Sequence, residues 1–554
     1  MNKPFVSTDS LSKQTVLSDS LWIVALGVLC FVPFLGSVHL FDWDEINFAE
    51  SAREMLITGN YTTVQIDFQP FWEKPPLFFW MQVLAMKVFG VSEFAARFPN
   101  AVIGIITLLT LYIIGNQLHG RRFGWLWVLA YVGSFTPHFY FKTALIDPTF
   151  NYFIFLGIWF SYRAANEPQK PLRYSAWAGA CIGLALLTKG PVGGLLWGLT
   201  ALVIWAQYRF RAVWTVKQVV VFVGCTLGVA ATWFGLEFYH HGFWFFEKFI
   251  EYQIRLFATP DSGHGQPFYY HFVVVLIGCF PSSIFAIRGM GLRVYRSENI
   301  SFGEVMRTLF WVVMILFSIV TTKIVHYSSM AWYPVTYFAA LSILAFIEKR
   351  AFWNRWLTVG LGVIGTLLGL VLMAVPLIGM NAAVIQPYIQ DAFVVGNLQA
   401  NVTWLGWEWV WGGCYLLIVW WTIGQLSRGR AQNGVVTLLL STAVCLLLVG
   451  RMVVPKIEAY VQGAAIRFYQ AHAGEAVYIE TLGFKSYAHL FYFDKQPCSN
   501  PQCSNTEWLL KGAVDKPTYF VTKITDAEGY RQQPTIEVLK EENGFVFFKR
   551  KNTK

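Results

Sequence analysis

The decisive stretch of this sequence runs Phe41-Asp-Trp-Asp-Glu-Ile-Asn-Phe-Ala-Glu-Ser-Ala-Arg-Glu-Met55. It follows directly on an apolar run over residues 20–39, and the next such run begins only near residue 99. The segment between them, about residues 40–98, is too long to be a simple turn. We therefore expect it to form structure of its own between the first two long helices.

Two helices are predicted within this segment. Apolar residues recur at helical spacing over residues 47–55, and a second amphipathic pattern covers residues 76–89, beside Phe71-Trp-Glu-Lys-Pro-Pro-Leu77. Helices with one apolar and one polar face lie at the surface of a bilayer. We expect these two helices to lie on a membrane surface and to cover a cavity.

The composition indicates that most of the chain lies in lipid. Of its 554 residues, 55% are hydrophobic and only 13% are charged, whereas soluble proteins carry roughly 25% charged residues. This excludes a wholly soluble, a disordered and a fibrous protein. The net charge of +10 comes from Lys and Arg residues that stand between the apolar runs. It therefore needs no nucleic-acid partner, and no groove-reading motif is present.

About thirteen apolar runs are long enough to span a bilayer, because a hydrocarbon core about 30 Å thick takes about 20 helical residues. They lie near residues 20–39, 99–117, 124–140, 145–162, 175–188, 190–207, 216–237, 269–288, 306–324, 329–347, 356–378, 406–424 and 434–453. The sequence thus predicts an all-α polytopic membrane protein, with a transmembrane domain over residues 1–455.

Charges in the loops predict the orientation. Lys and Arg residues collect in alternate loops, such as those holding Arg121 and Arg211, and such loops stay in the cytoplasm. The loops between them hold acidic residues, Asp44 and Glu251 among them. An odd number of spans then places the N-terminus in the cytoplasm and the C-terminus outside.

Residues 456–554 have the pattern of a small soluble α/β domain, which the orientation places outside. The predicted elements are a helix over residues 459–472 and strands over residues 476–479, 519–522 and 545–548. Cys498 and Cys503 lie in a polar loop of this domain, where a disulfide is plausible. A zinc site is less favoured, because no second Cys or His pair accompanies them.

Three carboxylates are candidates for acid–base chemistry. Asp44 and Glu45 lie a few residues beyond the first span, where partial loss of hydration raises the pKa of a carboxylate toward a useful value. Asp147 faces the same side, and a carboxylate in the membrane costs about 2.5–3.5 kcal/mol, which favours a partner or a wet cavity. The plainer alternatives are a solvated acid pair and, for Asp147, helix capping beside Pro148.

Cations on the same side of the membrane would suit a phosphate carried by a lipid. The candidates are Lys74, Lys189, Arg255 and Lys323, with His326 and Tyr327 close to the last of them. A lysine that snorkels to the interface is the alternative for each. No Gly-rich nucleotide loop is present, so a soluble nucleotide donor is not expected. Glu73, Asp44 and a His could bind a divalent ion, but three scattered ligands do not predict one.

These residues resemble, in type and order, the motifs of GT-C polyprenyl-phosphate-dependent glycosyltransferases, most closely the bacterial aminoarabinose transferases that modify lipid A. Asp44-Glu45 with Phe48-Ala49-Glu50 is similar to their acidic first-loop motif, Glu73-Lys74-Pro75 to a Glu-Lys-Pro element, and Asp147, Lys189 and Lys323 follow in the expected order. The resemblance covers roughly residues 20–350. It implies that Asp44 and Asp147 line a catalytic cavity, and that Lys74 and Lys189 help to hold the lipid phosphate.

The chain departs from the family at one position. The aminoarabinose transferases have an Arg where this chain has Asn47, so one expected phosphate contact is missing. Arg53 and Arg255 are the candidates to replace it. The departure leaves the sugar and the acceptor open, because related protein O-mannosyltransferases share the Asp-Glu motif.

The residues and the resemblance together imply an inner-membrane enzyme that transfers a sugar from a polyprenyl (undecaprenyl) phosphate at the periplasmic face. Asp44, Glu45 and Asp147 are its catalytic candidates, and no cofactor is required. The acceptor is lipid A or another glycolipid, with a protein hydroxyl as the alternative, and membrane lipids surround the enzyme. A secondary transporter also has many spans, but transporters place their charges near the bilayer midplane, often in two repeated halves.

Overall fold

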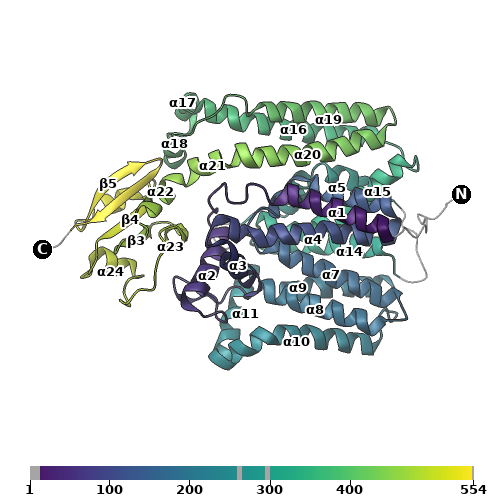
Figure 1. The fold of residues 1–554 in the computed structure, drawn as a ribbon, viewed down its shortest axis with the longest axis horizontal. Coiled ribbons are helices and arrows are strands. Elements are labelled where there is room, and N and C mark those ends of the chain that lie inside the picture. Colours follow the sequence, from purple (N-terminus) through teal and green to yellow (C-terminus); the bar gives the residue numbers. More distant parts are fainter. Residues whose placement is uncertain (1–12, 259–264, 293–299, 552–554) are drawn as a thin grey trace.

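A bundle of long helices makes up most of the molecule, and a small sheet stands at one end of it (Figure 1). The computed structural model describes residues 13–258, 265–292 and 300–551. The long helices are α1 (Lys13–Phe31), α4 (Glu93–His119), α5 (Arg121–Val132), α7 (Asp147–Asn166), α8 (Pro171–Lys189), α9 (Val192–Gln207), α10 (Val216–His241), α12 (Tyr270–Gly278), α13 (Ser282–Met290), α14 (Phe302–Ile319), α15 (Trp332–Ile347), α16 (Arg355–Met380), α19 (Val410–Ser427) and α20 (Ala431–Met452).

Each of the thirteen apolar runs overlaps a helix of this bundle, and the run near residues 269–288 is divided between α12 and α13, which meet at an angle of 113°. In the described part of the chain, seven helices are long and apolar enough to cross a membrane, or eight if that bent pair is one span. The other runs form helices that are shorter or less apolar, such as the 12-residue α5 and the 16-residue α9. The protein therefore has several candidate spans, and the count of about thirteen is not confirmed.

Small residues allow the helices of the bundle to approach closely. A Cβ atom on Gly179 of α8 would lie 2.2 Å from the carbonyl oxygen of Phe222 in α10, and one on Gly289 of α13 would overlap the carbonyl of Phe338 in α15. Helices packed inside a membrane use small residues at such contacts because lipid supplies no hydrophobic force between them. The glycines therefore fix how the bundle packs.

A second group of short elements covers one end of the bundle. It comprises α2 (Asp44–Thr58), β1 (Gln65–Ile66), β2 (Gln69–Pro70), α3 (Leu77–Phe89), α6 (Phe135–Tyr140), α11 (Phe243–Ala258), the 3-10 helix η2 (Val325–Ala331), α17 (Ala382–Ile385), η3 (Gln386–Tyr388) and α18 (Ala392–Asn397). The strands β1 and β2 form an antiparallel pair. Figure 1 shows α2 and α3 at the end of the bundle that faces the C-terminal unit, and α11 at the same end beside α10.

The C-terminal residues form a mixed α/β unit against this group. Its elements are α21 (Val454–Val461), α22 (Gly463–Ala471), β3 (Tyr478–Leu482), α23 (Ala488–Phe491), α24 (Thr506–Lys511), β4 (Thr518–Lys523), α25 (Ala527–Arg531), β5 (Ile536–Glu542) and β6 (Phe545–Arg550). The strand order is β3-β4-β6-β5, in which only β3 and β4 run parallel. The helix predicted over residues 459–472 is divided into α21 and α22. The sequence missed β5, an edge strand whose residues after Ile536 are mostly exposed.

The helices predicted in the first long loop are both present, as α2 and α3. The sequence predicts that α2 lies on a membrane surface. In the structure, every residue from Glu45 to Met55 is instead buried by protein. Arg53 shows why: its guanidinium donates to Glu50 at 2.8 and 2.7 Å, to Asp494 at 2.6 Å and to the carbonyl of Lys495 at 2.7 Å. The helix is thus held between the bundle and the C-terminal unit.

Glu54 of α2 is a buried carboxylate beside Glu50. Burial and the charge of Glu50 raise its pKa to about 9, although the backbone N–H of Phe68 donates to it at 2.8 Å. The folded protein therefore keeps Glu54 protonated at neutral pH, whereas the unfolded chain ionises it above about pH 4.5. The contribution of Glu54 to the folding stability is therefore fully present below about pH 4.5 and decreases as the pH rises toward 9.

We predict that Glu54→Gln stabilises the protein increasingly as the pH rises. The amide has nearly the shape of the protonated carboxyl and does not ionise in this pH range. The variant therefore keeps its folding stability where the wild type loses stability through the ionisation of Glu54. The thermal midpoint of the solubilised protein, measured at pH 5 and pH 8.5, should favour the variant more at pH 8.5. Equal midpoints at pH 8.5, or an advantage confined to pH 5, would contradict the buried protonated state.

Candidate functional site

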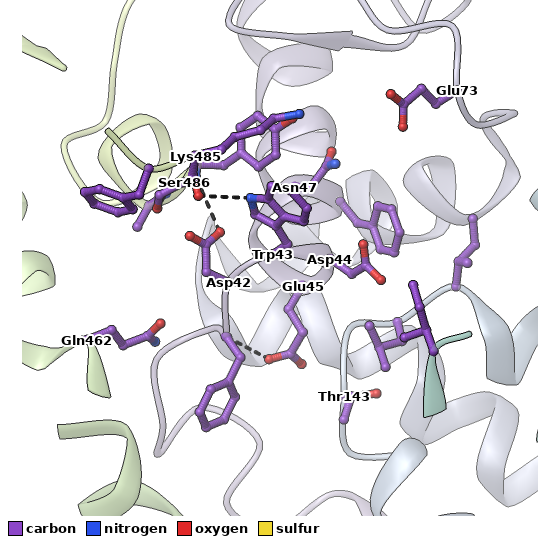
Figure 2. A pocket seen from close by; sticks show the side chains of 18 of the residues that line it. Asp42, Trp43, Asp44, Glu45, Asn47, Glu73, Thr143, Gln462, Lys485 and Ser486 are labelled. Carbon is purple, nitrogen blue, oxygen red and sulfur yellow. Dashed lines mark hydrogen bonds between the residues drawn. The ribbon is translucent and has the colours of Figure 1, made fainter. Parts of the chain in front are cut away.

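A cavity of about 700 Å³ lies where the bundle, α2, α11 and the C-terminal unit meet. Part of its lining is drawn in Figure 2. Its polar lining between residues 42 and 189 is Asp42, Asp44, Glu45, Asn47, Glu73, Lys74, Thr143, Asp147 and Lys189, and that from later segments includes Arg255, His326, Tyr327, Lys485 and Lys523. Charged groups from both halves of the sequence therefore share one hollow.

A buried ion pair between Glu45 and Arg97 lies beside the part of the cavity that Glu45 lines. Arg97 of α4 donates from Nε and Nη2 to the two carboxylate oxygens of Glu45, at 3.0 and 2.8 Å. The backbone N–H groups of Phe41 and Ala144 also donate to Glu45, at 2.9 and 2.6 Å. Burial acts to raise the pKa of Glu45, but Arg97 and these N–H groups hold it below its ordinary value.

The remaining donors of Arg97 bind the chain that enters α2. They reach the carbonyl oxygens of Leu35, Val38 and His39 at 2.8, 2.7 and 3.0 Å. The ion pair thus joins the segment after α1, the start of α2, helix α4 and the turn before α7. Asp44 and Glu45 point in different directions from the start of α2 (Figure 2), and Asp44 faces the cavity.

Asp147 lies at the first residue of α7 and pairs with the last residue of α8. The Lys189 Nζ donates to its Oδ1 at 2.6 Å. His326 of η2 lies between the two aspartates, with its Nε2 3.8 Å from an Asp147 oxygen and 3.9 Å from an Asp44 oxygen. Asn151 of α7 donates to Ser329 of η2 at 2.7 Å, which fixes η2 against α7. The two carboxylates therefore share one cationic neighbourhood.

Two further cations meet at Tyr252 of α11. The Lys74 Nζ donates to the Tyr252 hydroxyl at 3.1 Å and lies 4.8 Å from the ring centre, and the Arg255 guanidinium lies 5.2 Å from the same ring. Lys189 lies 5.1 Å from the Tyr327 ring. Aromatic rings help to hold these cations in place, and Lys189 is also paired with Asp147. An anion that entered the cavity would meet these three cations.

Ten of the twelve residues singled out from the sequence line this cavity. The exceptions are Lys323 and Arg53. Lys323 is buried, and its ammonium group donates to the carbonyl of Val320 at 2.8 Å, away from the cavity lining. Arg53 is engaged in the contacts between α2 and the C-terminal unit, so it does not replace the arginine missing at Asn47. Arg255 lines the cavity and stays the candidate for that place.

Sequence reasoning missed several polar residues of the lining, among them Asp42, Lys485 and Lys523. Asp42 points toward Ser486 (Figure 2), and it accepts a hydrogen bond from the Tyr487 N–H at 3.4 Å. Asp42 is exposed as a residue, yet desolvation by the enclosing protein raises the pKa of its carboxyl to about 6. Asp42 stands in the same acidic loop as Asp44 and could have been found there. The two lysines carry no such signal, because only the fold brings the C-terminal unit to the site.

The structure bears on two further predictions. Cys498 and Cys503 are free thiols here that interact with each other, so their pairing as a disulfide stays a prediction. Among residues 13–258, 265–292 and 300–551, no group of three His, Cys, Asp or Glu side chains is arranged to hold a metal ion. A divalent ion therefore has no support from these side chains.

We predict that Glu45→Ala destabilises the protein by about 3–5 kcal/mol, because it leaves the Arg97 charge buried without its partner. The matched control is Glu542→Ala, which breaks an exposed pair with Arg467 and should cost less than about 1 kcal/mol. Unfolding of both variants in the same mixed micelles measures the difference. Equal losses for the two variants would contradict the role given to the buried pair.

Comparison with protein families gives a match over residues 73–233 to the family described as dolichyl-phosphate-mannose-protein mannosyltransferase. Similar curated proteins include the undecaprenyl phosphate-alpha-4-amino-4-deoxy-L-arabinose arabinosyl transferases of Shewanella sediminis and Edwardsiella ictaluri. They are 24% and 27% identical over 58% and 55% of this chain. The matches span 59% and 56% of those relatives' own lengths, a little over half of each.

Among solved structures, the fold is similar to that of ArnT from Cupriavidus metallidurans bound to undecaprenyl phosphate. The TM-score is 0.75 at 19% identity, with 97% of this chain and 98% of that chain covered. The same protein in the apo state gives a TM-score of 0.74 at 17% identity over the same shares. The chain thus has the fold of ArnT over nearly its whole length. The resemblance to aminoarabinose transferases that the motifs predict is confirmed by sequence and by fold.

Proposed function

We propose that this chain is a membrane glycosyltransferase that moves a sugar from a polyprenyl phosphate carrier to an acceptor, most favourably a glycolipid of the lipid A type. The single observation that carries the proposal is the cavity that Asp44 lines together with the cations Lys74, Lys189 and Arg255. Its fold is that of a protein solved with undecaprenyl phosphate, and its curated relatives are named as undecaprenyl-phosphate-dependent arabinosyl transferases.

The chemistry needs a base and positive charge in the same cavity. An acceptor hydroxyl attacks the anomeric carbon of the sugar and gives its proton to the Asp44 carboxylate. The bond from that carbon to the phosphate oxygen breaks, and the polyprenyl phosphate leaves with the bonding electrons. Lys74, Lys189 and Arg255 stabilise the negative charge that grows on the phosphate, the kind of term that dominates such reactions. A single displacement of this kind inverts the anomeric centre.

Asp147 and Glu45 have supporting roles in this scheme. Asp147 is already paired with Lys189 at 2.6 Å, so it directs that ammonium toward the phosphate instead of taking a proton. Both carboxylate oxygens of Glu45 accept hydrogen bonds from Arg97 and from two backbone N–H groups, so Glu45 has no free acceptor position for a substrate. Asp44, with a side chain 40% exposed, is the carboxylate best placed to act as the base.

The protein lies in the bacterial inner membrane in this proposal, with its cavity and C-terminal unit on the periplasmic side and its N-terminus in the cytoplasm. Two observations support this orientation. The acidic residues of the first long loop line the cavity. The Lys- and Arg-rich loops, such as the one at Arg121, belong to the alternate set of loops that is expected in the cytoplasm. Lipid-linked sugars reach such a cavity from the surrounding membrane lipids.

A protein acceptor is the second candidate, because residues 73–233 match a family named for protein mannosyl transfer. A secondary transporter is a weaker alternative. Its charges would lie near the middle of the bundle on broken helices. The charged cavity here is lined by residues of α2 and of the C-terminal unit, and these elements lie at one end of the bundle (Figure 1). Transfer assays with lipid and peptide acceptors separate a glycolipid acceptor from a protein acceptor. Sugar movement into vesicles without transfer would favour the transporter.

We predict that Asp44→Asn and Lys74→Ala impair transfer in different ways. Loss of the base should lower kcat by about 10²-fold or more, with little change in donor binding. Loss of Lys74 removes a phosphate contact and should also weaken the binding of the polyprenyl phosphate. Both are measured with purified protein, radiolabelled polyprenyl-phosphate sugars, and lipid and peptide acceptors.

Asp526→Asn is the control for this experiment, since it makes the same chemical change on the exposed surface of the C-terminal unit. It should transfer sugar at the wild-type rate. Wild-type rates for both Asp44→Asn and Lys74→Ala would show that this cavity is not where the sugar is transferred.

A further inference from the structure

Asp44 is the first residue of α2, so its position depends on the loop that enters this helix. That loop, residues 38–43, contains no helix or strand of its own. Arg97 and Glu45 hold part of its backbone through the hydrogen bonds described above. The N–H and the carbonyl of Leu40, in the middle of the loop, are not among those groups. Because a buried peptide group needs a hydrogen-bond partner, Leu40 must find its partners elsewhere.

The C-terminal unit supplies both partners of Leu40. The Leu40 N–H donates to the Tyr492 hydroxyl at 2.6 Å, and the Leu40 carbonyl accepts from the Gln462 Nε2 at 2.8 Å. Tyr492 directly follows α23, and Gln462 lies between α21 and α22. Both side chains belong to buried residues. Loss of either side-chain group leaves a buried peptide group unpaired, which costs more than the loss of a bond on the surface.

Two further contacts of the C-terminal unit lie on either side of Leu40. The His39 Nδ1 lies 3.2 Å from a carboxylate oxygen of Glu458 in α21. The Trp43 indole N–H donates to the carbonyl of Lys485 at 3.2 Å (Figure 2). Trp43 directly precedes Asp44. The C-terminal unit therefore holds the loop from its middle to the residue before α2.

The carboxylate of Asp44 has little else to fix its position. Its side chain is 40% exposed, and the Nε2 of His326 lies 3.9 Å from it, too far for a hydrogen bond. A general base must lie within hydrogen-bond reach of the proton that it takes. A displacement of about 1 Å can lower a rate by about 10²-fold. The backbone at the start of α2 therefore decides whether Asp44 meets an acceptor hydroxyl.

We propose that Tyr492 and Gln462 are positioning residues for sugar transfer. By holding the N–H and the carbonyl of Leu40, they fix the start of α2 and keep the Asp44 carboxylate where the acceptor hydroxyl gives up its proton. The inference rests on the proposed function, and it assigns the C-terminal unit a part in the chemical step. The alternative is a purely structural role, in which loss of these bonds weakens donor binding and stability along with the rate.

Tyr492→Phe tests the proposal most sharply, because it removes one hydroxyl from a side chain that lies outside the cavity lining. Gln462→Met removes the second bond with a side chain of similar size, and it tests the same point if Tyr492→Phe does not fold. Transfer is measured with purified protein, radiolabelled polyprenyl-phosphate sugars, and lipid and peptide acceptors. Each variant should lose about tenfold in kcat, and the double variant more. The donor KM and the affinity for polyprenyl phosphate should change less than about twofold, since the phosphate is bound by other groups.

Hydrogen–deuterium exchange of the peptide that covers residues 38–43 measures the two bonds directly. The Leu40 N–H is buried and bonded to Tyr492, so it should exchange slowly in the wild type. In Tyr492→Phe it should exchange about tenfold faster or more, while the bundle helices keep their protection. This readout does not depend on any enzymatic activity.

Tyr478→Phe is the matched control. It also removes a tyrosine hydroxyl from the C-terminal unit, one that donates to Asp515 at 2.9 Å and does not contact the loop before α2. This variant should keep the wild-type kcat and the wild-type exchange of residues 38–43.

Three results would overturn the inference and leave the proposed function standing. The first is a wild-type kcat in the double variant. The second is a loss of kcat that Tyr478→Phe shares, and the third is a loss of polyprenyl-phosphate binding as large as the loss of kcat. Unchanged exchange at Leu40 in Tyr492→Phe would also overturn the inference. A wild-type protein that binds polyprenyl phosphate but transfers sugar to no acceptor would instead overturn the proposed function itself.

Discussion

The buried ion pair of Arg97 and Glu45 is the contact on which the site depends. A charge inside protein is tolerated only when its partners meet it fully, and here one guanidinium and one carboxylate use nearly all their hydrogen bonds on each other and on backbone groups. Those backbone groups belong to the chain before α2 and to Ala144, three residues before Asp147. The pair therefore brings the two acidic segments to one place before any substrate is present.

The same arrangement explains how the carboxylates of the site differ. Glu45 is committed to Arg97 and Asp147 to Lys189, while Asp44 remains open to the cavity. His326 lies within 4 Å of both aspartates and stands between them. Of these three carboxylates, Asp44 is thus left for chemistry, while Glu45 holds Arg97 and the backbone and Asp147 holds Lys189. A cavity lined in this way suits an anionic donor and a neutral hydroxyl.

The sequence predicted the parts of this protein that depend on local patterns. Apolar runs identified the bundle helices, and the alternation of charged loops placed ten of the candidate residues on one side, where the fold brings them together. What it could not predict depends on distant contacts. Arg97 lies just before the second apolar run, 52 residues from Glu45, so the role of Glu45 as a structural anchor left no local signal. The sequence makes Arg53 a candidate phosphate ligand, whereas in the fold its guanidinium donates to Asp494 and to the carbonyl of Lys495. Lys485 and Lys523 share no motif with the first loop.

In the proposed reaction the carrier phosphate lies beside Lys74, Lys189 and Arg255, in the same cavity as Asp44. An experimental structure of the protein with a bound polyprenyl phosphate tests it most directly. The account predicts that the phosphate oxygens lie at hydrogen-bonding distance, about 3 Å, from these cations, with room for a sugar between the phosphate and the Asp44 carboxylate. A phosphate bound elsewhere on the bundle, with this cavity empty, would contradict it.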